Sequence, residues 1–449
     1  MPHPTPSSGS VSTATVQVNK PAVIAAYLAL AGMIIYTMIY SLTWGALDFS
    51  VYRLGAMTVF NNEGFTKELY VIDLLGSKDG FHLPFTYPPF AALLFVPIAF
   101  IPKWLGVTLM MVLAYVVAWW LATLIYDYAN SRGVQIPFQQ YLGRRATIAL
   151  LTAVILFSGP WRRGLGLVQI NPLIMLLVLW DFVRPATRVP RGVFIGIAGG
   201  IKLTPLAFGL ILLMRKDVKG VLTLGLSFLV TVGIGFLFLP KEAVEFWTSA
   251  VSDPSRVGNI NYLDNISIQG WLMHLGLTEG AALKVPQYGL TLLLLVGTAL
   301  MLPLLEKRGM LISQLALNAF LMLSMSPISW SHHNTWLPLI ITALWVDAFP
   351  VFFTKGTAVM AGIARVCAWV GSLGLIISPM WIGWALHGSQ DNLDYIAKSS
   401  LAITAIPIIA LFFAISLWIV VGLTYRRQIA AETPDGVVEA KAGYPAVRG

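Results

Sequence analysis

A single carboxylate follows the first long apolar run of the sequence. Asp48 lies in the stretch Trp44–Arg53, directly after the apolar run 21–43. A carboxylate at an apolar boundary is partly desolvated, which raises its proton affinity toward that of a useful general base. A solvated helix cap that pairs with Arg53 is the alternative interpretation. Asp48 is therefore a candidate base for taking a proton from a hydroxyl group.

Three basic residues could bind an anion such as a phosphate. Lys202 sits in Gly199-Gly200-Ile201-Lys202-Leu203-Thr204-Pro205, where glycine and proline bend an otherwise apolar segment. An ionisable residue inside a membrane segment is a functional candidate by default, and snorkelling is its main alternative. Arg162 and Arg163 form a basic pair. A guanidinium fork suits two phosphate oxygens, although such a pair could also anchor lipid headgroups.

A polar gap with two adjacent histidines separates two later apolar runs. It reads Ser329-Trp330-Ser331-His332-His333-Asn334. The histidines could ligate a metal together with Asp48, but adjacent side chains point apart, which makes that evidence weak. Contact with a sugar or a phosphate is the preferred interpretation. The sequence has no HExxH motif, dinucleotide fingerprint or P-loop, so we expect no metal and no cofactor.

Aromatic and amide side chains complete the candidate site. Tyr87 begins Tyr87-Pro88-Pro89-Phe90, in which paired prolines fix the backbone. Tyr87 could offer an aromatic platform to a sugar, or the prolines could simply mark a rigid entry to a helix. Gln169 and Asn171 enter an apolar stretch and need partners. They could join helix to helix or hydrogen-bond a ligand.

The overall composition places these residues in a membrane protein. Of 449 residues, 57% are hydrophobic and 11% are charged, and the mean hydropathy is +0.76. Soluble domains carry roughly a quarter charged residues, so a cytosolic enzyme, a nucleic-acid-binding domain and a disordered scaffold are excluded. The one cysteine, Cys367, excludes a disulfide within the chain.

The apolar runs predict an all-α polytopic membrane protein. A span needs about 20 apolar residues, and on that basis we expect about 10 full transmembrane helices plus 2 short re-entrant or broken segments. The broken segments are 88–102, interrupted by Pro97, and 192–214, interrupted around Lys202. The full spans are predicted at 21–43, 104–126, 146–159, 168–183, 219–239, 285–305, 309–328, 335–354, 366–386 and 401–424.

The distribution of basic residues predicts the orientation. If the N-terminus is cytoplasmic and both broken segments return to the side they came from, six arginines between residues 127 and 191 stay inside, as the positive-inside rule prefers. The candidate site then lies on the extracytoplasmic face of a multi-pass plasma-membrane protein. The six arginines are Arg132, Arg144, Arg145, Arg184, Arg188 and Arg191.

Five motifs in this order resemble glycosyltransferase family 87, a family of membrane enzymes with the GT-C-type fold. The resemblance runs from about residue 21 to 424, and its nearest branch is the actinobacterial phosphatidylinositol mannoside mannosyltransferases. The motifs are Asp48-Phe49-Ser50-Val51-Tyr52, Tyr87-Pro88-Pro89, Gln169-Ile170-Asn171-Pro172, Ile201-Lys202-Leu203-Thr204-Pro205 and Ser326-Pro327-Ile328-Ser329-Trp330-Ser331-His332-His333.

The resemblance implies a polyprenyl-phosphate-mannose donor, a phosphatidylinositol mannoside acceptor with four mannoses, and α-1,2 transfer outside the cytoplasm. It places the catalytic carboxylate in the first external loop, at Asp48. We expect donor-phosphate binding by Lys202, Arg162, Arg163, His332 and His333, and sugar or acceptor binding by Tyr52, Arg53, Tyr87, Gln169, Asn171, Trp330 and Asn334.

The expected domain layout and the alternatives follow from the same evidence. Residues 1–20 are a disordered cytoplasmic N-terminus, 21–424 a transmembrane catalytic domain with external loops 44–87 and 240–283, and 425–449 a cytoplasmic tail. A lipomannan or lipoarabinomannan branching enzyme with the same donor would show the same motifs. A lipid transporter or flippase is expected to have broken helices at matching positions in two halves of the chain, and we find no such repeat.

Overall fold

The computed structural model of the protein describes residues 18–60, 67–76, 82–185, 187–353, 357–387 and 398–424. The described chain is mostly helical, with one short antiparallel pair of strands, β1 (Leu75–Gly76) and β2 (His82–Leu83). The predicted cytoplasmic tail and nearly all of the predicted N-terminal segment lie outside these residues.

Long apolar helices confirm a polytopic membrane protein. Within the described ranges, six helices are long and apolar enough to cross a membrane. A bent pair, α6 (Gln139–Phe157) and α7 (Gly159–Leu167), meets at 69° and raises the number to seven if it forms one span. The six are α1 (Lys20–Thr43), α5 (Lys103–Ser131), α11 (Val218–Phe238), α14 (Gly280–Lys307), α17 (Ala358–Ile377) and α19 (Lys398–Thr424).

Several other predicted spans form helices too short to pass the same test, so a count of about ten stays a prediction. The run 168–183 starts late, because Val168 adopts a left-handed conformation (φ 56°) before α8 (Asn171–Val183). The run 366–386 is divided at Ser378 (φ 104°) between α17 and α18 (Pro379–His387). The predicted run 309–328 forms α15 (Leu311–Met325). The run 335–354 forms α16 (Leu337–Thr342) and the π-helix η6 (Ala343–Phe352).

Both segments expected to be broken are broken. Residues 88–102 form α3 (Pro89–Leu94) and α4 (Val96–Ala99). Residues 192–214 form α9 (Val193–Ile201), the 3-10 helix η2 (Thr204–Phe208) and α10 (Gly209–Met214). Lys202 is extended (φ −149°, ψ 130°) where α9 ends. Gly200, two residues before Lys202, allows α9 to contact α11, since a Cβ at this position would lie 2.1 Å from Thr231 Oγ1.

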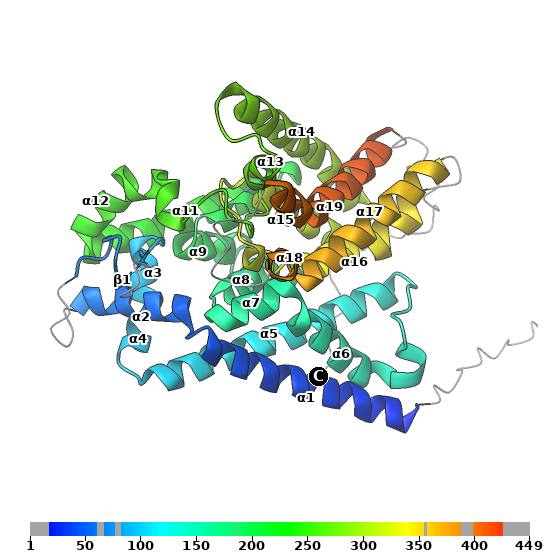
Figure 1. The fold of residues 1–449 in the computed structure, drawn as a ribbon, viewed down its shortest axis with the longest axis horizontal. Helices are drawn as coiled ribbons and strands as arrows, with labels where there is room; N and C mark the ends of the chain where they lie inside the picture. The colour runs from blue at the N-terminus through cyan, green and yellow to red at the C-terminus, as the bar shows by residue number, and fades with distance from the viewer. Residues whose placement is uncertain are drawn as a thin grey trace, which may run out of the picture.

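Some of the elements between the long helices lie at one end of the molecule. In Figure 1, α2 (Leu47–Phe60), β1 and α12 (Pro240–Thr248) lie at the left end, and α1 runs from the right end toward them. Helix α7 packs on α1 and on the 3-10 helix η5 (Ser331–His333). The 3-10 helices η3 (Ala250–Ser252) and η4 (Pro254–Val257) follow α12 in the chain, and α13 (Ile268–His274) packs against α14 and α19.

Candidate active site

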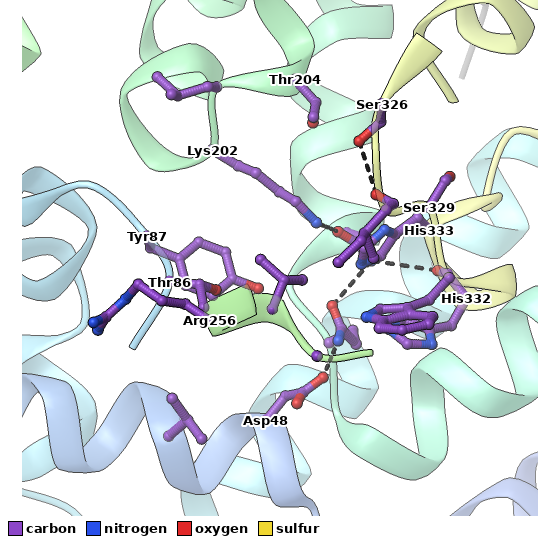
Figure 2. Close-up of a pocket in the computed structure, with 18 of the residues that line it drawn as sticks. Asp48, Thr86, Tyr87, Lys202, Thr204, Arg256, Ser326, Ser329, His332 and His333 are labelled. Carbon is purple, nitrogen blue, oxygen red and sulfur yellow. Dashed lines mark hydrogen bonds between the residues drawn. The ribbon is translucent and has the colours of Figure 1, made fainter. Parts of the chain in front are cut away.

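A cavity of about 920 Å³ lies among these elements and brings most of the predicted site residues together. Figure 2 shows Asp48, Tyr87, Lys202, His332 and His333 around it. Its walls come from distant parts of the chain: the start of α2, the stretch before α3, the α7–α8 turn, the end of α9, the loop after α12, and the loop between α15 and α16.

Asp48 lies in the first turn of α2, directly after a sharp turn at the end of α1. Gly45 (φ 64°) and Ala46 (φ 49°) make that turn. Asp48 Oδ2 accepts a hydrogen bond from Gln169 Nε2. Burial raises the pKa of Asp48 to about 7, although the positive charges of Lys202 and Arg163 act against this shift. A carboxyl with that pKa is suited to general-base catalysis near neutral pH.

Lys202 faces the same cavity from the break after α9. Its Nζ donates to Asn171 Oδ1 at 3.2 Å and lies 5.9 Å from the centre of the Tyr87 ring. Asn171 Nδ2 donates to Gln169 Oε1 at 2.9 Å and to the His332 carbonyl oxygen at 3.3 Å. The predicted amide residues are therefore hydrogen-bonded to Asp48 and Lys202.

Two tyrosines form the wall beside Asp48. The Tyr52 and Tyr87 hydroxyl oxygens lie 3.0 Å apart. Ile170 N donates to the Tyr52 hydroxyl at 3.4 Å, and Tyr70 donates its hydroxyl proton to the Tyr87 carbonyl at 2.9 Å. These bonds hold the stretch before α3 against α2 and leave Tyr52 and Tyr87 lining the cavity.

Backbone hydrogen bonds join the segment 329–334, which carries the two histidines, to the residues directly before α13. Ser331 N donates to the Asp264 carbonyl at 3.0 Å, and Ile266 N donates to the Ser329 carbonyl at 2.8 Å. The rings of His332 and His333 meet edge to face, 4.8 Å apart, and both line the cavity. Burial lowers the pKa of both imidazoles, so they are neutral and each can donate one hydrogen bond.

The two arginines of the predicted basic pair have different surroundings, which does not fit the expectation that both contact the donor phosphate. Arg163 lines the cavity, with its Nε 3.3 Å from Asp264 Oδ2 and its guanidinium 4.8 Å from the Trp44 ring centre. Arg162 is only 1% exposed. It donates to the carbonyls of Phe157 (2.8 Å) and Ile377 (2.7 Å), and so joins α7 to the end of α17.

Two further predicted residues are absent from the described walls of the cavity. Arg53 turns the other way along α2 and donates to the Ala99 carbonyl at 3.3 Å. Asn334 is 1% exposed and is not a lining residue, although its neighbours His332 and His333 are. Trp330 does line the cavity, with its ring edge-on to Tyr262 at 5.6 Å.

The sequence did not single out several polar residues of this site. Asp264 is fully buried beside Arg163 and His332, and Arg256 lines the cavity while donating to the Tyr70 carbonyl at 2.6 Å. Both belong to the stretch between α11 and α14, which carries no recognisable motif. The described residues hold no group of three or more His, Cys, Asp or Glu side chains placed to bind a metal. Other lining residues missed are Trp44, His82, Thr86, Asp253, Asn259, Tyr262, Ser326 and Ser329.

Comparison with known proteins gives relatives that cover most of the chain. A polyprenol-phosphate-mannose-dependent α-(1-2)-phosphatidylinositol pentamannoside mannosyltransferase of Mycolicibacterium smegmatis is 31% identical over 71% of this chain and 72% of its own. A protein of the same description from Mycobacterium tuberculosis is 28% identical over 85% of this chain and 82% of its own. A phosphatidylinositol mannoside mannosyltransferase of M. smegmatis is 29% identical over 71% and 74%.

No solved structure gives a significant match. The profile of glycosyltransferase family 87 matches residues 85–327. That range contains Tyr87, Gln169, Asn171 and Lys202, whereas Asp48 precedes it and the two histidines follow it. The matched range covers more than half of the sequence, and with these relatives it shows that the chain belongs to glycosyltransferase family 87.

Proposed function

We propose that the protein transfers mannose from polyprenyl-phosphate-mannose to a phosphatidylinositol mannoside in α-1,2 linkage. The names of the relatives contain this donor, this linkage and this class of acceptor. One observation of the structure carries the chemistry: a carboxylate with a pKa of about 7 and a lysine face the same cavity. This arrangement supplies a base for the acceptor hydroxyl and a positive charge for the donor phosphate.

Asp48 is the general base in this proposal. The acceptor 2-hydroxyl attacks C1 of the donor mannose while Asp48 takes its proton. The bond between C1 and the phosphate oxygen breaks, and the electron pair leaves with polyprenyl phosphate. A β-linked donor and an α-linked product require this single inverting displacement. One carboxylate is then enough, because a phosphate leaves without strong protonation.

Lys202 compensates the negative charge that develops on the departing phosphate. Electrostatic stabilisation of this kind often contributes the largest share of catalysis. His333 and Arg163 line the same cavity and add hydrogen-bond donors. Arg162 has no part in this step, since two backbone carbonyls occupy its guanidinium. Trp330 and Tyr87 offer ring surfaces to sugars.

The active site faces the extracytoplasmic side in this proposal, within a GT-C-type fold of about ten spans. The basic stretches after α5 and α8 support it, since such stretches mark the cytoplasmic side. Single cysteines in a Cys367→Ala background test the orientation. Asn259→Cys, at the exposed rim of the cavity, should react with an impermeant thiol reagent added to intact cells. Arg188→Cys should react only after the membrane is opened, and the reverse pattern would overturn the assignment.

The transfer itself is tested with purified protein in lipid vesicles. Polyprenyl-phosphate-mannose labelled in the sugar is supplied with phosphatidylinositol tetramannoside, and the product should be one mannose longer and sensitive to an α-1,2-mannosidase. Lipomannan as the better acceptor would indicate a branching enzyme instead. Movement of intact labelled lipid across the vesicle without transfer would indicate a transporter and would refute the proposal.

A further inference from the structure

Two amide side chains connect the proposed base to the proposed phosphate-binding lysine. Lys202 Nζ donates to Asn171 Oδ1 at 3.2 Å, and Asn171 Nδ2 donates to Gln169 Oε1 at 2.9 Å. Gln169 Nε2 donates in turn to Asp48 Oδ2. Dashes in Figure 2 mark this line of hydrogen bonds, which lies between the labelled residues Lys202 and Asp48.

The two ends set the direction of every bond in this line. An ammonium can only donate, and an ionised carboxylate can only accept. Asn171 must therefore turn its oxygen to Lys202, which leaves its nitrogen for Gln169. The same reasoning turns the nitrogen of Gln169 toward Asp48. Exchange of O and N in either amide would set donor against donor or acceptor against acceptor, so each side chain has one favourable orientation.

The backbone holds both amides in place. Gln169 and Asn171 flank the turn between α7 and α8, where Gln169 N donates to the Gly164 carbonyl at 2.8 Å. Ile170 N, between them, donates to the Tyr52 hydroxyl at 3.4 Å. Gln169 and Asn171 are 8% and 7% exposed. Because water has little access to them, their hydrogen bonds are stronger than those of surface amides.

We propose that Gln169 and Asn171 are positioning residues that form a directional relay between Asp48 and Lys202. The sequence suggested that they contact the sugar or acceptor, whereas the geometry gives their polar atoms to the two charged groups. The inference rests on the mannosyl transfer proposed above. It adds that the orientation of the base and the charge available to the phosphate depend on one another.

The relay has a consequence for the reaction. When Asp48 takes the acceptor proton it loses its negative charge, and the phosphate gains one negative charge as its bond to C1 breaks. The total charge of the site is unchanged, but the negative charge has moved. The bond from Gln169 to the neutral carboxyl weakens, and the ammonium of Lys202 then interacts mainly with the phosphate.

The pH dependence of the reaction reports on this relay. The groups that face Asp48 are Lys202, Arg163 and the hydroxyls of Tyr52 and Tyr87. Of these, Lys202 is linked to Asp48 through the amides. An ionised carboxylate is favoured by donated hydrogen bonds and by nearby positive charge. Breaking the relay should therefore make Asp48 harder to deprotonate, and the reaction should need a higher pH.

The experiment compares Gln169→Met and Asn171→Leu, which keep the shape of each side chain and remove its polar atoms. For both variants we expect the acidic limb of kcat/KM for mannosyl transfer to move to higher pH. At pH 7 the rate should fall by about 100-fold, as for a small displacement of a catalytic group, and the fall should be smaller at pH 9. The KM for the acceptor should change little.

Asn171→Leu is the sharper of the two variants. It leaves the bond between Gln169 and Asp48 untouched, so a purely local role of Gln169 predicts no change in its pH profile. The relay predicts a shift in the same direction as for Gln169→Met. If Asn171→Leu does not fold, Asn171→Ser tests the same point, because the shorter hydroxyl does not reach Gln169. Gln287→Leu, which removes a distant amide pair with Gln269, is the matched control and should keep the wild-type profile.

Three outcomes would overturn the relay. A raised acceptor KM with an unchanged pH profile would make the amides sugar contacts. An equal loss of rate at every pH would make them structural. A shift for Gln169→Met alone would reduce the role to one local hydrogen bond. In each case transfer by the wild-type protein would still support the proposed function, and its absence would refute the function rather than the relay.

Discussion

Two aspartates differ in their access to the cavity: Asp48 is half-buried at its wall, and Asp347 is fully buried among the helices. Asp347 in η6 is 0% exposed, accepts from Tyr128 at 2.6 Å and from Ser313, and lies 3.4 Å from Arg132 Nε. Asp48 accepts from Gln169 and lines the cavity. Asp347 is not among the described lining residues. Burial of a carboxylate therefore does not by itself mark a catalytic group; access to a space that a substrate can enter does.

The same contrast separates the two neighbouring arginines. Both guanidiniums lie against aromatic rings, Arg162 at 3.5 Å from Trp381 and Arg163 at 4.8 Å from Trp44. Backbone carbonyls occupy Arg162, while Arg163 pairs with a carboxylate and still reaches the cavity. Successive residues of a helix point about 100° apart, so a basic pair seldom acts as a pair on one ligand.

We expect the largest effect from Asp48→Asn. The amide keeps the shape of the carboxyl but cannot take the acceptor proton, and general-base catalysis contributes about 10²–10⁴-fold. We expect transfer to fall by that factor in purified protein that melts at or above the wild-type temperature and still binds donor. Asp48→Glu should restore little, because the longer side chain moves the carboxylate away from the hydroxyl. Wild-type turnover in Asp48→Asn would overturn the mechanism.

Asp347→Ala is the counterpart at the structural carboxylate. The substitution removes the carboxylate that accepts from the hydroxyls of Tyr128 and Ser313 and pairs with Arg132, at a cost of about 3–5 kcal/mol in the free energy of unfolding. Thermal unfolding in detergent measures this loss. Activity per folded molecule should stay near that of the wild type. A stable but inactive variant would instead place Asp347 in the active site and would contradict its assignment as a structural residue.

The sequence predicts those features of the structure that depend only on residues close together in the chain. The long helices and the breaks in 88–102 and 192–214 follow from apolar length and from proline and glycine, which act on their immediate neighbours. Asp48 and Lys202 stand out for the same reason, as charges at apolar boundaries. Each could be named before the fold was known.

The partnerships within the site could not be predicted in this way. Gln169 donates to a carboxylate 121 residues earlier in the chain, and Arg162 to a carbonyl 215 residues later. Such pairings depend on how whole helices pack. Residues 161–163 lie in helix α7, and the rotation of that helix decides which arginine faces the cavity. Asp264 lies in a loop whose composition carries no signal for its position.

Lys202→Met tests whether the positive charge of Lys202 contributes to donor binding and transfer. The apolar side chain keeps the length of the lysine stem but removes its charge. By analogy with the loss of one partner of a buried charge pair, we expect about 2–4 kcal/mol of lost transition-state stabilisation, measured as kcat/KM for the donor. Donor affinity, measured by displacement of a fluorescent polyprenyl phosphate, should weaken as well. Normal binding and turnover would leave Lys202 as a residue that only extends toward the membrane surface.

The smallest effect we expect is the dependence of wild-type activity on pH, which compares the two aspartates without any substitution. Burial raises the pKa of Asp48 to about 7, and only the ionised form can take a proton. Activity should therefore be lost as the pH falls through that value, about tenfold for each pH unit below it, and should level off above it. Asp347 does not line the cavity in the described structure, so Asp347→Ala should keep the wild-type pH profile. Lys202→Met should move the profile to higher pH, because it removes a positive charge that favours the ionised form of Asp48. The measurement is kcat/KM between pH 5.5 and 9 in one buffer series, with recovery of activity after return to pH 8 to exclude unfolding. A flat profile would mean that Asp48 does not take the proton, and an identical profile for Lys202→Met would separate the lysine from the base.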